Sequence, residues 1–258
     1  MQKTSNAPRH AIDISEEAGV RYLHFGSDWV QGAMRIARPW SLELDYTREM
    51  MAGLLLRSEK DWPRSALLIG LGAGSLAKFI YHNLPDCRIT VIEINPQVEF
   101  IARQYFKLPD DPRRLEVIIG CGADYMLGGN RAFDLLLADG FDPDAKTGAL
   151  DTSPFYQACR ARLTETGLFG TNLLGHHRGY KDSVGRIRTA FDNRVAVFPA
   201  CPSGNTIAFA CGGKAVDISL GEMQERAIQL KKNQRLDLLP MISRLKLTHS
   251  LADSNFYI

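Results

Sequence analysis

Three glycines at alternate positions, followed by a strand-like run that ends in an acid, constrain the fold of this chain most strongly. An apolar run is followed by Gly70, Gly72 and Gly74, then by a helix-like segment and a second apolar run that ends at Glu93. This order predicts a β-α-β unit whose glycines let a ligand approach the backbone closely. The Glu93 carboxylate, at the tip of the second strand, can accept hydrogen bonds from both hydroxyls of a ribose.

The glycine spacing narrows the class of ligand. A dinucleotide fingerprint reads G-x-G-x-x-G, whereas this loop reads G-x-G-x-G and has Ser75 where the third glycine would stand. A phosphate-binding loop lysine is also missing. The pattern therefore favours a nucleoside without phosphates, such as S-adenosylmethionine or a relative. The alternative is an ordinary β-α turn in which the glycines serve packing alone.

Composition indicates an ordinary soluble enzyme. A length of 258 residues, 45% of them hydrophobic, predicts one large domain or one domain with appendages. The formal net charge of +2 predicts no attraction to nucleic acid or membrane. The start of the chain lacks the apolar core of a signal peptide, and no run is long enough to span a bilayer. Five widely spaced cysteines contain no CxxC pair, so we expect reduced thiols, a cytoplasmic protein and no metal.

The order of predicted elements indicates an α/β fold. Residues 1–50 are expected to form a small N-terminal β element and linker: strands at 11–14, 20–25 and 30–36 with a turn at 16–19, and then a helix over 44–56. Residues 51–213 are expected to form the nucleoside-binding domain, and 214–258 a C-terminal helical extension. Alternating strands and helices predict a mostly parallel sheet covered on both faces, with an antiparallel hairpin at its edge. The predicted strands are 66–70, 88–93, 115–119, 133–138, 167–173, 194–199 and 205–211, and the helices 75–84, 96–106, 152–163 and 180–192.

A second cluster of acids follows the fourth predicted parallel strand. Asp139 ends the run Phe133-Asp-Leu-Leu-Leu-Ala, and Asp142 follows in a loop closed by Pro143. Ligands of open α/β sheets lie outside the carboxyl ends of the strands, so Asp139 is expected to face the same crevice as Glu93. Two carboxylates there suit a cationic substrate, and one can take a proton from an attacking amine. Alternatively, Asp142 starts a turn and Asp139 caps a helix.

Several motifs together resemble one family. They are the glycine loop, Glu93-Ile-Asn, Gly120-Cys-Gly122, Asp139-x-x-Asp142-Pro143, Ser153-x-Phe-Tyr156 and Pro202-Ser-Gly204, in this order. From about Tyr22 to Gly213 the chain resembles the polyamine aminopropyltransferases, the spermidine synthase family. The resemblance implies a class I S-adenosylmethionine-dependent methyltransferase-like (Rossmann-like) sheet and a homodimer. It also implies transfer of an aminopropyl group from decarboxylated S-adenosylmethionine to putrescine or a longer amine, with methylthioadenosine as the product.

The resemblance also implies roles for single residues. Glu93 matches the acid that holds the ribose, Asp139 the acid that orients and deprotonates the amine, and Asp142 its partner. Gln31 matches a glutamine at the adenosine end, and Tyr46 lies one residue out of register from a tyrosine at the amine site. The resemblance implies that the nucleoside is contacted by Gln31, Gly70, Gly72, Ala73, Gly74, Glu93, Cys121, Gly122 and Asp139.

The chain departs from the family pattern at four places. Ala73 stands where the family's loop carries an acid that anchors the aminopropyl ammonium, so the preference for the decarboxylated donor is weakened. Cys121 replaces the acid of a Gly-Asp-Gly turn at adenine, and Cys201 replaces a tyrosine before Pro-Ser-Gly. Gly-Phe replaces small hydroxyl residues between Asp139 and Asp142. Two alternatives therefore stay open: a methyltransferase that uses intact S-adenosylmethionine, or a catalytically silent nucleoside-binding homologue.

Other candidate residues are weaker. His176 and His177 follow the fifth predicted parallel strand, but adjacent histidines point in different directions and form a poor metal pair. Phe155 and Tyr156 follow the acidic loop and either form a wall of the pocket or belong to the core.

Overall fold

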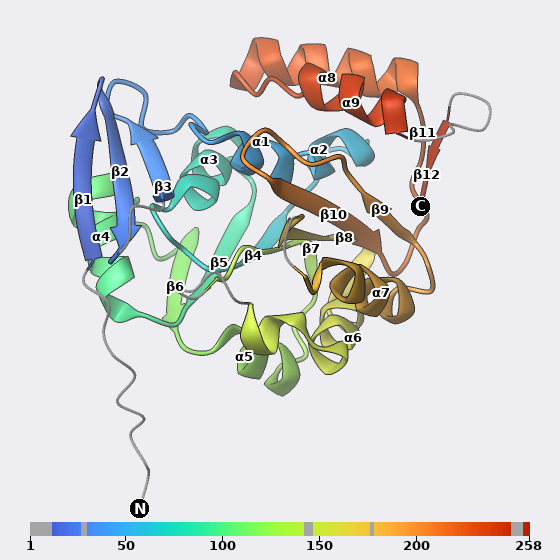
Figure 1. Cartoon of the computed structure of the whole chain (residues 1–258), viewed down its shortest axis with the longest axis horizontal. Helices are drawn as coiled ribbons and strands as arrows, with labels where there is room; N and C mark the ends of the chain where they lie inside the picture. Colours follow the sequence, from blue (N-terminus) through green and yellow to red (C-terminus); the bar gives the residue numbers. More distant parts are fainter. Residues whose placement is uncertain (1–11, 27–29, 142–146, 176–177, 249–254) are drawn as a thin grey trace, which may run out of the picture.

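A twisted sheet of seven strands forms the centre of the molecule (Figure 1). The computed structural model describes residues 12–26, 30–141, 147–175, 178–248 and 255–258. The strand order across the sheet is β6-β5-β4-β7-β8-β10-β9. The first five strands in this order run parallel to one another, and β10 pairs antiparallel with both β8 and β9. The predicted α/β fold with an antiparallel edge hairpin is confirmed. The strands are β4 (Ser65–Ile69), β5 (Arg88–Glu93), β6 (Leu115–Ile119), β7 (Phe133–Ala138), β8 (Leu163–Leu174), β9 (Val195–Val197) and β10 (Asn205–Cys211).

Helices cover both faces of this sheet because successive strand residues point to opposite sides. In β4, Leu68 joins the apolar cluster of one face and Leu67 that of the other; in β7, Leu137 and Leu136 divide in the same way. The first face is covered by α1 (Asp45–Met50), α2 (Gly53–Leu56), α3 (Ser75–Asn83), α4 (Pro96–Phe106), α8 (Leu220–Gln234) and α9 (Leu239–Thr248). The second is covered by α5 (Gly122–Gly128), α6 (Ser153–Ala161) and α7 (Tyr180–Ala190), with the 3-10 turn η1 (Gly148–Asp151).

The N-terminal β element is a separate antiparallel sheet beside the glycine loop (Figure 1). It consists of β1 (Ile12–Glu17), β2 (Val20–Phe25) and β3 (Val30–Arg35). The turn between β1 and β2 is at Ala18–Gly19, where φ is +49° and +75°. Strand β1 therefore extends to Glu17, and the turn is shorter than the one predicted at 16–19. Positive φ at both central residues matches the twist of a hairpin, which explains the two-residue connection.

Some elements differ from the sequence predictions. The helix predicted over 44–56 is interrupted at Met51 and Ala52 and becomes α1 and α2. At the start of α2, a Cβ on Gly53 would lie 3.3 Å from the Phe209 ring, so this turn packs closely on β10. Helix α5 and the small strands β11 (Asp217–Ser219) and β12 (Asn255–Tyr257) were not predicted. Three-residue strands carry little periodicity, and their pairing joins segments far apart in sequence.

All five cysteines are free, as the sequence predicts. Four of them are buried and Cys121 is partly buried. None of the helices within the described residues has the length and apolar character needed to cross a bilayer.

Lys78 is a buried cation that joins the two helices beside the glycine loop. It lies on α3 with 1% of its surface exposed, and its Nζ donates to the carbonyl oxygen of Phe106, at the end of α4, over 2.8 Å. Burial lowers the pKa of Lys78 to about 7. A neutral amine can still donate this hydrogen bond, so the contact persists at pH values at which Lys78 has lost its charge.

We expect Lys78→Met to be more stable than the wild type at pH 6 and to lose that advantage by pH 10. In the unfolded chain the lysine keeps its ordinary pKa of 10.5, whereas the folded value is about 7. Between these values the unfolded state binds the extra proton, so wild-type stability rises with pH, by about 1.4 kcal/mol per pH unit. Urea unfolding of both proteins at pH 6, 8 and 10 measures the difference. A difference that does not change with pH would contradict the lowered pKa.

Candidate active site

The glycine loop forms the floor of the site between β4 and α3. Gly70, Gly72 and Gly74 have φ of +96°, +51° and +68°, values that favour glycine. A Cβ on Gly70 would lie 2.4 Å from the backbone oxygen of Asp139, so the loop and the end of β7 are in direct contact. The loop is a surface of bare backbone at the carboxyl ends of β4, β5 and β7, where α/β proteins bind ligands.

Glu93 clamps this loop from the end of β5. Its carboxylate accepts hydrogen bonds from the backbone N–H groups of Leu71 and Asn95, each over 2.9 Å. Only 7% of Glu93 is exposed; burial raises its pKa, and these hydrogen bonds oppose the rise. A carboxylate has about four acceptor positions, so Glu93 can still accept from a ribose hydroxyl beside its backbone donors. The arrangement therefore fits the nucleoside role expected of Glu93.

Strand β3 covers one side of the loop and buries Ala73. A Cβ on Gly32 would lie 2.6 Å from the Ala73 Cβ, and Ala73 is 2% exposed in a cluster with Leu23, Met34 and Phe106. The Ala73 side chain therefore packs against the N-terminal sheet and is not open to a ligand. Gln31 is partly buried, with its carbonyl oxygen 3.3 Å from where a Cβ on Gly72 would lie.

The turn at Gly120–Gly122 begins beside Glu93. The Gly120 N–H donates to the Glu93 carbonyl oxygen over 2.9 Å, and Cys121, partly buried, is the N-cap residue of α5. A Cβ on Gly122 would lie 2.4 Å from Ile69 Cγ2 and 3.3 Å from Leu150 of η1. Gly122 thus lets α5 pack tightly on the end of β4. The turn therefore shares an edge of the sheet with the glycine loop and Glu93.

Asp139 follows β7 and faces helix α1. Its Oδ1 accepts from the Asn172 Nδ2 of β8 over 2.9 Å, and its carboxylate also hydrogen bonds the Tyr46 hydroxyl. Burial raises the pKa of Asp139, and these two hydrogen bonds oppose the rise. Burial and the Asp139 carboxylate raise the pKa of Tyr46. A carboxylate with this environment is a suitable proton acceptor for an amine.

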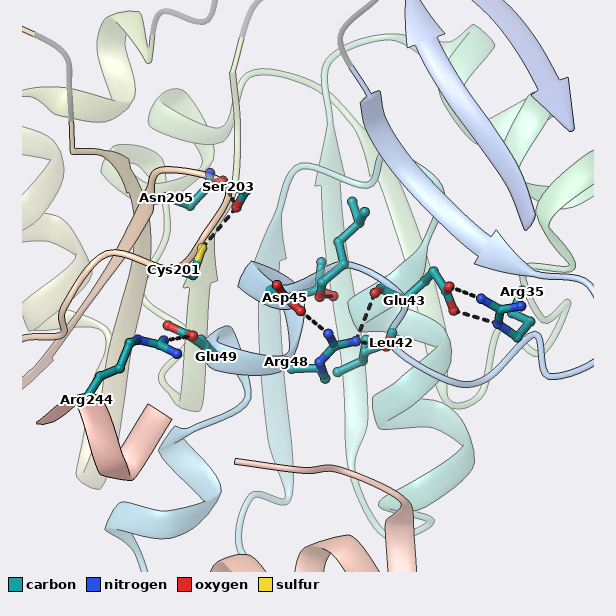
Figure 2. A network of polar contacts seen from close by, with 12 residues as sticks. Arg35, Leu42, Glu43, Asp45, Arg48, Glu49, Cys201, Ser203, Asn205 and Arg244 are labelled. Atoms are coloured by element: carbon teal, nitrogen blue, oxygen red, sulfur yellow. Dashed lines mark hydrogen bonds and ion pairs between the residues drawn. The ribbon is translucent and has the colours of Figure 1, made fainter. Parts of the chain in front are cut away.

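Helix α1 (Asp45–Met50), which carries Tyr46, is held by one ion pair to α9 and by hydrogen bonds to the backbone before it (Figure 2). Arg48 donates to two backbone carbonyls just before α1, each over 2.8 Å, and pairs with Asp45. Glu49 is 5% exposed and pairs with Arg244 of α9. Burial raises the pKa of Glu49, against the effect of Arg244. The C-terminal extension therefore fixes the helix that brings Tyr46 to Asp139.

The remaining candidates divide into three groups. Asp142, His176 and His177 lie outside the described residues. Phe155 and Tyr156 are at most 1% exposed and belong to the core under β7 and β8. Within the described ranges, no group of three His, Cys, Asp or Glu side chains is arranged to hold a metal ion.

Sequence reasoning did not identify Asn172 as a site residue. It is 3% exposed near the carboxyl end of β8, in a run that is otherwise mostly apolar. A polar residue at a buried strand end was the available signal, because such a side chain requires a hydrogen-bonding partner. Asn205, partly buried at the start of β10, was also not identified; it donates to the Asn172 Oδ1 over 3.0 Å.

Comparison with known proteins identifies the family. A sequence model described as "Spermine/spermidine synthase domain" matches residues 44–217. A polyamine aminopropyltransferase of Neisseria meningitidis is 36% identical, covering 96% of this chain and 93% of that protein. The chain belongs to the spermine/spermidine synthase family. The resemblance read from the sequence motifs is confirmed.

Solved structures agree with this family assignment. A spermidine synthase in complex with the transition-state analogue AdoDATO is similar with a TM-score of 0.60 and 25% identity, over 79% of this chain and 74% of that one. Human methyltransferase-like protein 13 in complex with SAH is similar with a TM-score of 0.65 and 26% identity, over 74% of this chain and 93% of that one. Both likenesses support the methyltransferase-like sheet predicted for this family member.

Proposed function

We propose that this protein transfers an aminopropyl group from decarboxylated S-adenosylmethionine to a polyamine acceptor such as putrescine. The observation that carries the proposal is Asp139, held by Tyr46 and Asn172 next to the glycine loop and Glu93. A nucleoside end and a proton acceptor would thus lie along one edge of the sheet, at the carboxyl ends of β4, β5 and β7. The similarity to polyamine aminopropyltransferases over nearly the whole chain supports the same activity.

The reaction requires a neutral amine in line with the carbon next to a sulfonium. The new N–C bond forms as the C–S bond breaks, the sulfur keeps the electron pair, and methylthioadenosine leaves. Asp139 takes the proton that the amine nitrogen must lose, and Tyr46 helps to orient the carboxylate. Because the sulfonium is a good leaving group, positioning and a local base provide most of the catalysis. Gln31, Ala73 through its backbone, Cys121, Gly122 and Asp142 are proposed to complete the site.

We expect decarboxylated S-adenosylmethionine to raise the melting temperature more than intact S-adenosylmethionine at matched concentration. A ligand at about a hundred times its Kd adds about 2.7 kcal/mol of stability, which differential scanning fluorimetry detects readily. Release of methylthioadenosine on adding putrescine then tests turnover. Preference for the intact donor would indicate methyl transfer instead, and stabilisation by neither would contradict the nucleoside site.

Methyl transfer is the second candidate. The buried Ala73 side chain offers no charge to the donor, and the likeness to methyltransferase-like protein 13 favours a site for intact S-adenosylmethionine. This candidate is weaker, because an eEF1A lysine and N-terminal methyltransferase of Homo sapiens matches only 54% of this chain.

A homodimer and a cytoplasmic location also belong to the proposal. The sequence places two apolar side chains, Trp29 and Trp40, in or beside the N-terminal β element, where a second copy of the chain would cover exposed apolar surface. Trp40 stacks on the His82 ring with 5.4 Å between centroids, so this chain already covers part of it, and Trp29 lies outside the described residues. Light scattering of the purified protein measures the oligomeric state directly.

A further inference from the structure

A line of polar side chains extends from Asp139 across β8 and β10. Asn172 Nδ2 contacts Asp139 Oδ1 at 2.9 Å, and Asn205 Nδ2 contacts Asn172 Oδ1 at 3.0 Å. Ser203 Oγ lies 2.8 Å from Asn205 Oδ1, and Cys201 Sγ lies 3.0 Å from Ser203 Oγ. The far end of this line, from Cys201 to Asn205, is seen in Figure 2.

The donor and acceptor of every hydrogen bond in this line are determined because the line ends at a carboxylate. An ionised Asp139 only accepts, so Asn172 must present its NH2 group and turn its oxygen towards Asn205. Asn205 must then donate to Asn172, and its own oxygen must accept from the Ser203 hydroxyl. Ser203, having donated, accepts from the Cys201 thiol. All four donors therefore point towards Asp139, and aligned hydrogen bonds polarise one another.

No lysine or arginine among the described residues forms an ion pair with Asp139. In that part of the chain, the titratable groups that face it are Tyr46 from α1 and, beside Tyr46, Cys201 from the β9–β10 link. Asp142 lies outside the described residues. Neutral donors must therefore supply much of the stabilisation that a cation often gives to a carboxylate.

We propose that Asn172 and Asn205 are positioning residues that keep Asp139 ionised and oriented, as the last two links of a one-way hydrogen-bond chain from Cys201. Its catalytic meaning rests on the proposed function, in which Asp139 accepts the proton of the amine. Asn172 is 3% exposed, so it contributes a fixed dipole and is not free to rotate towards solvent. Asn172 and Asn205 lie diagonally across the antiparallel β8–β10 pair, which fixes their register.

The test measures the ionisation of Asp139 directly. Protein labelled with ¹³C at the aspartate carboxyl carbon is titrated by NMR without substrate, and the Asp139 signal is assigned by its loss in Asp139→Asn. We expect Asn172→Leu, which keeps the shape of the side chain, to raise the Asp139 midpoint by about one pH unit. Asn205→Leu should raise the Asp139 midpoint by less. It should add nothing in the Asn172→Leu background, because the line of hydrogen bonds to Asp139 is already interrupted there.

Thr206→Val is the matched control. Thr206 is 2% exposed on β10 and, as the neighbour of Asn205, points to the opposite face of the sheet, so the midpoint should not move. If Asn172→Leu does not fold, Asn205→Leu and Ser203→Ala decide the question. An Asp139 midpoint that is the same in wild type and in these chain variants would overturn the proposal.

The dependence of kcat/KM on pH provides the second measurement. Its acidic limb should move to higher pH by the same amount as the NMR midpoint, whereas a loss of packing alone would lower activity without moving the limb. If no aminopropyl transfer is detected at all, the proposed function fails. The NMR titration still decides whether the hydrogen-bonded line from Cys201 to Asn172 keeps Asp139 ionised.

Discussion

Replacing Asp139 with asparagine is expected to lower kcat for aminopropyl transfer by about 10²- to 10⁴-fold, the usual contribution of a positioned general base. Asparagine has nearly the same shape, and its amide oxygen can still accept from Asn172 in β8. It cannot take a proton from the attacking amine. Donor binding should change little, because Glu93 and the glycine loop hold the nucleoside end.

Steady-state release of methylthioadenosine and calorimetric binding of the donor separate these two effects. Asp182→Asn, at an exposed position in the first turn of α7, is the matched control and should leave both quantities unchanged. A kcat within about threefold of the wild type would show that Asp139 is not the base, since even a weak general base contributes more than that. Loss of donor binding together with kcat would instead place Asp139 at the nucleoside end.

Replacing Glu93 with glutamine is expected to weaken donor binding roughly 100-fold, because hydrogen bonds to a charged group are each worth about 1.5–3 kcal/mol. Both oxygens of Glu93 accept from backbone N–H groups, of Leu71 and Asn95. A glutamine must turn its NH2 group towards one of these donors, so one contact becomes repulsive. The loop loses its clamp, and the ribose loses one acceptor.

Isothermal titration with the donor measures this effect, and thermal unfolding shows how much of it comes from a disordered loop. Glu116→Gln makes the same charge change at an exposed position on the neighbouring strand β6, and should bind as the wild type does. In contrast to Asp139→Asn, the Glu93 variant should raise KM for the donor far more than it lowers kcat. Unchanged affinity would mean that the ribose binds elsewhere.

The geometry of the proposed nucleoside end is predictable from the sequence because its determinants are local. Gly70, Gly72 and Gly74 adopt backbone angles that favour glycine, and Glu93 lies at the strand end, where its spacing places it. The period-two pattern of the strands and their alternation with helices determine a parallel sheet, and hence the edge at which a ligand binds. These rules depend only on residues that are close in the sequence and on the preferred handedness of β-α-β connections.

Contacts between elements that are distant in the sequence were decided only by the tertiary structure. Tyr46 reaches Asp139 because α1 is broken from α2 and is held by Arg244 of the C-terminal extension. Ala73 is buried because Gly32 of the N-terminal sheet lies on it. Asn172 and Asn205 meet through an antiparallel register between β8 and β10. Periodicity determines which side of an element is buried, whereas the partner on that side depends on how the whole chain packs.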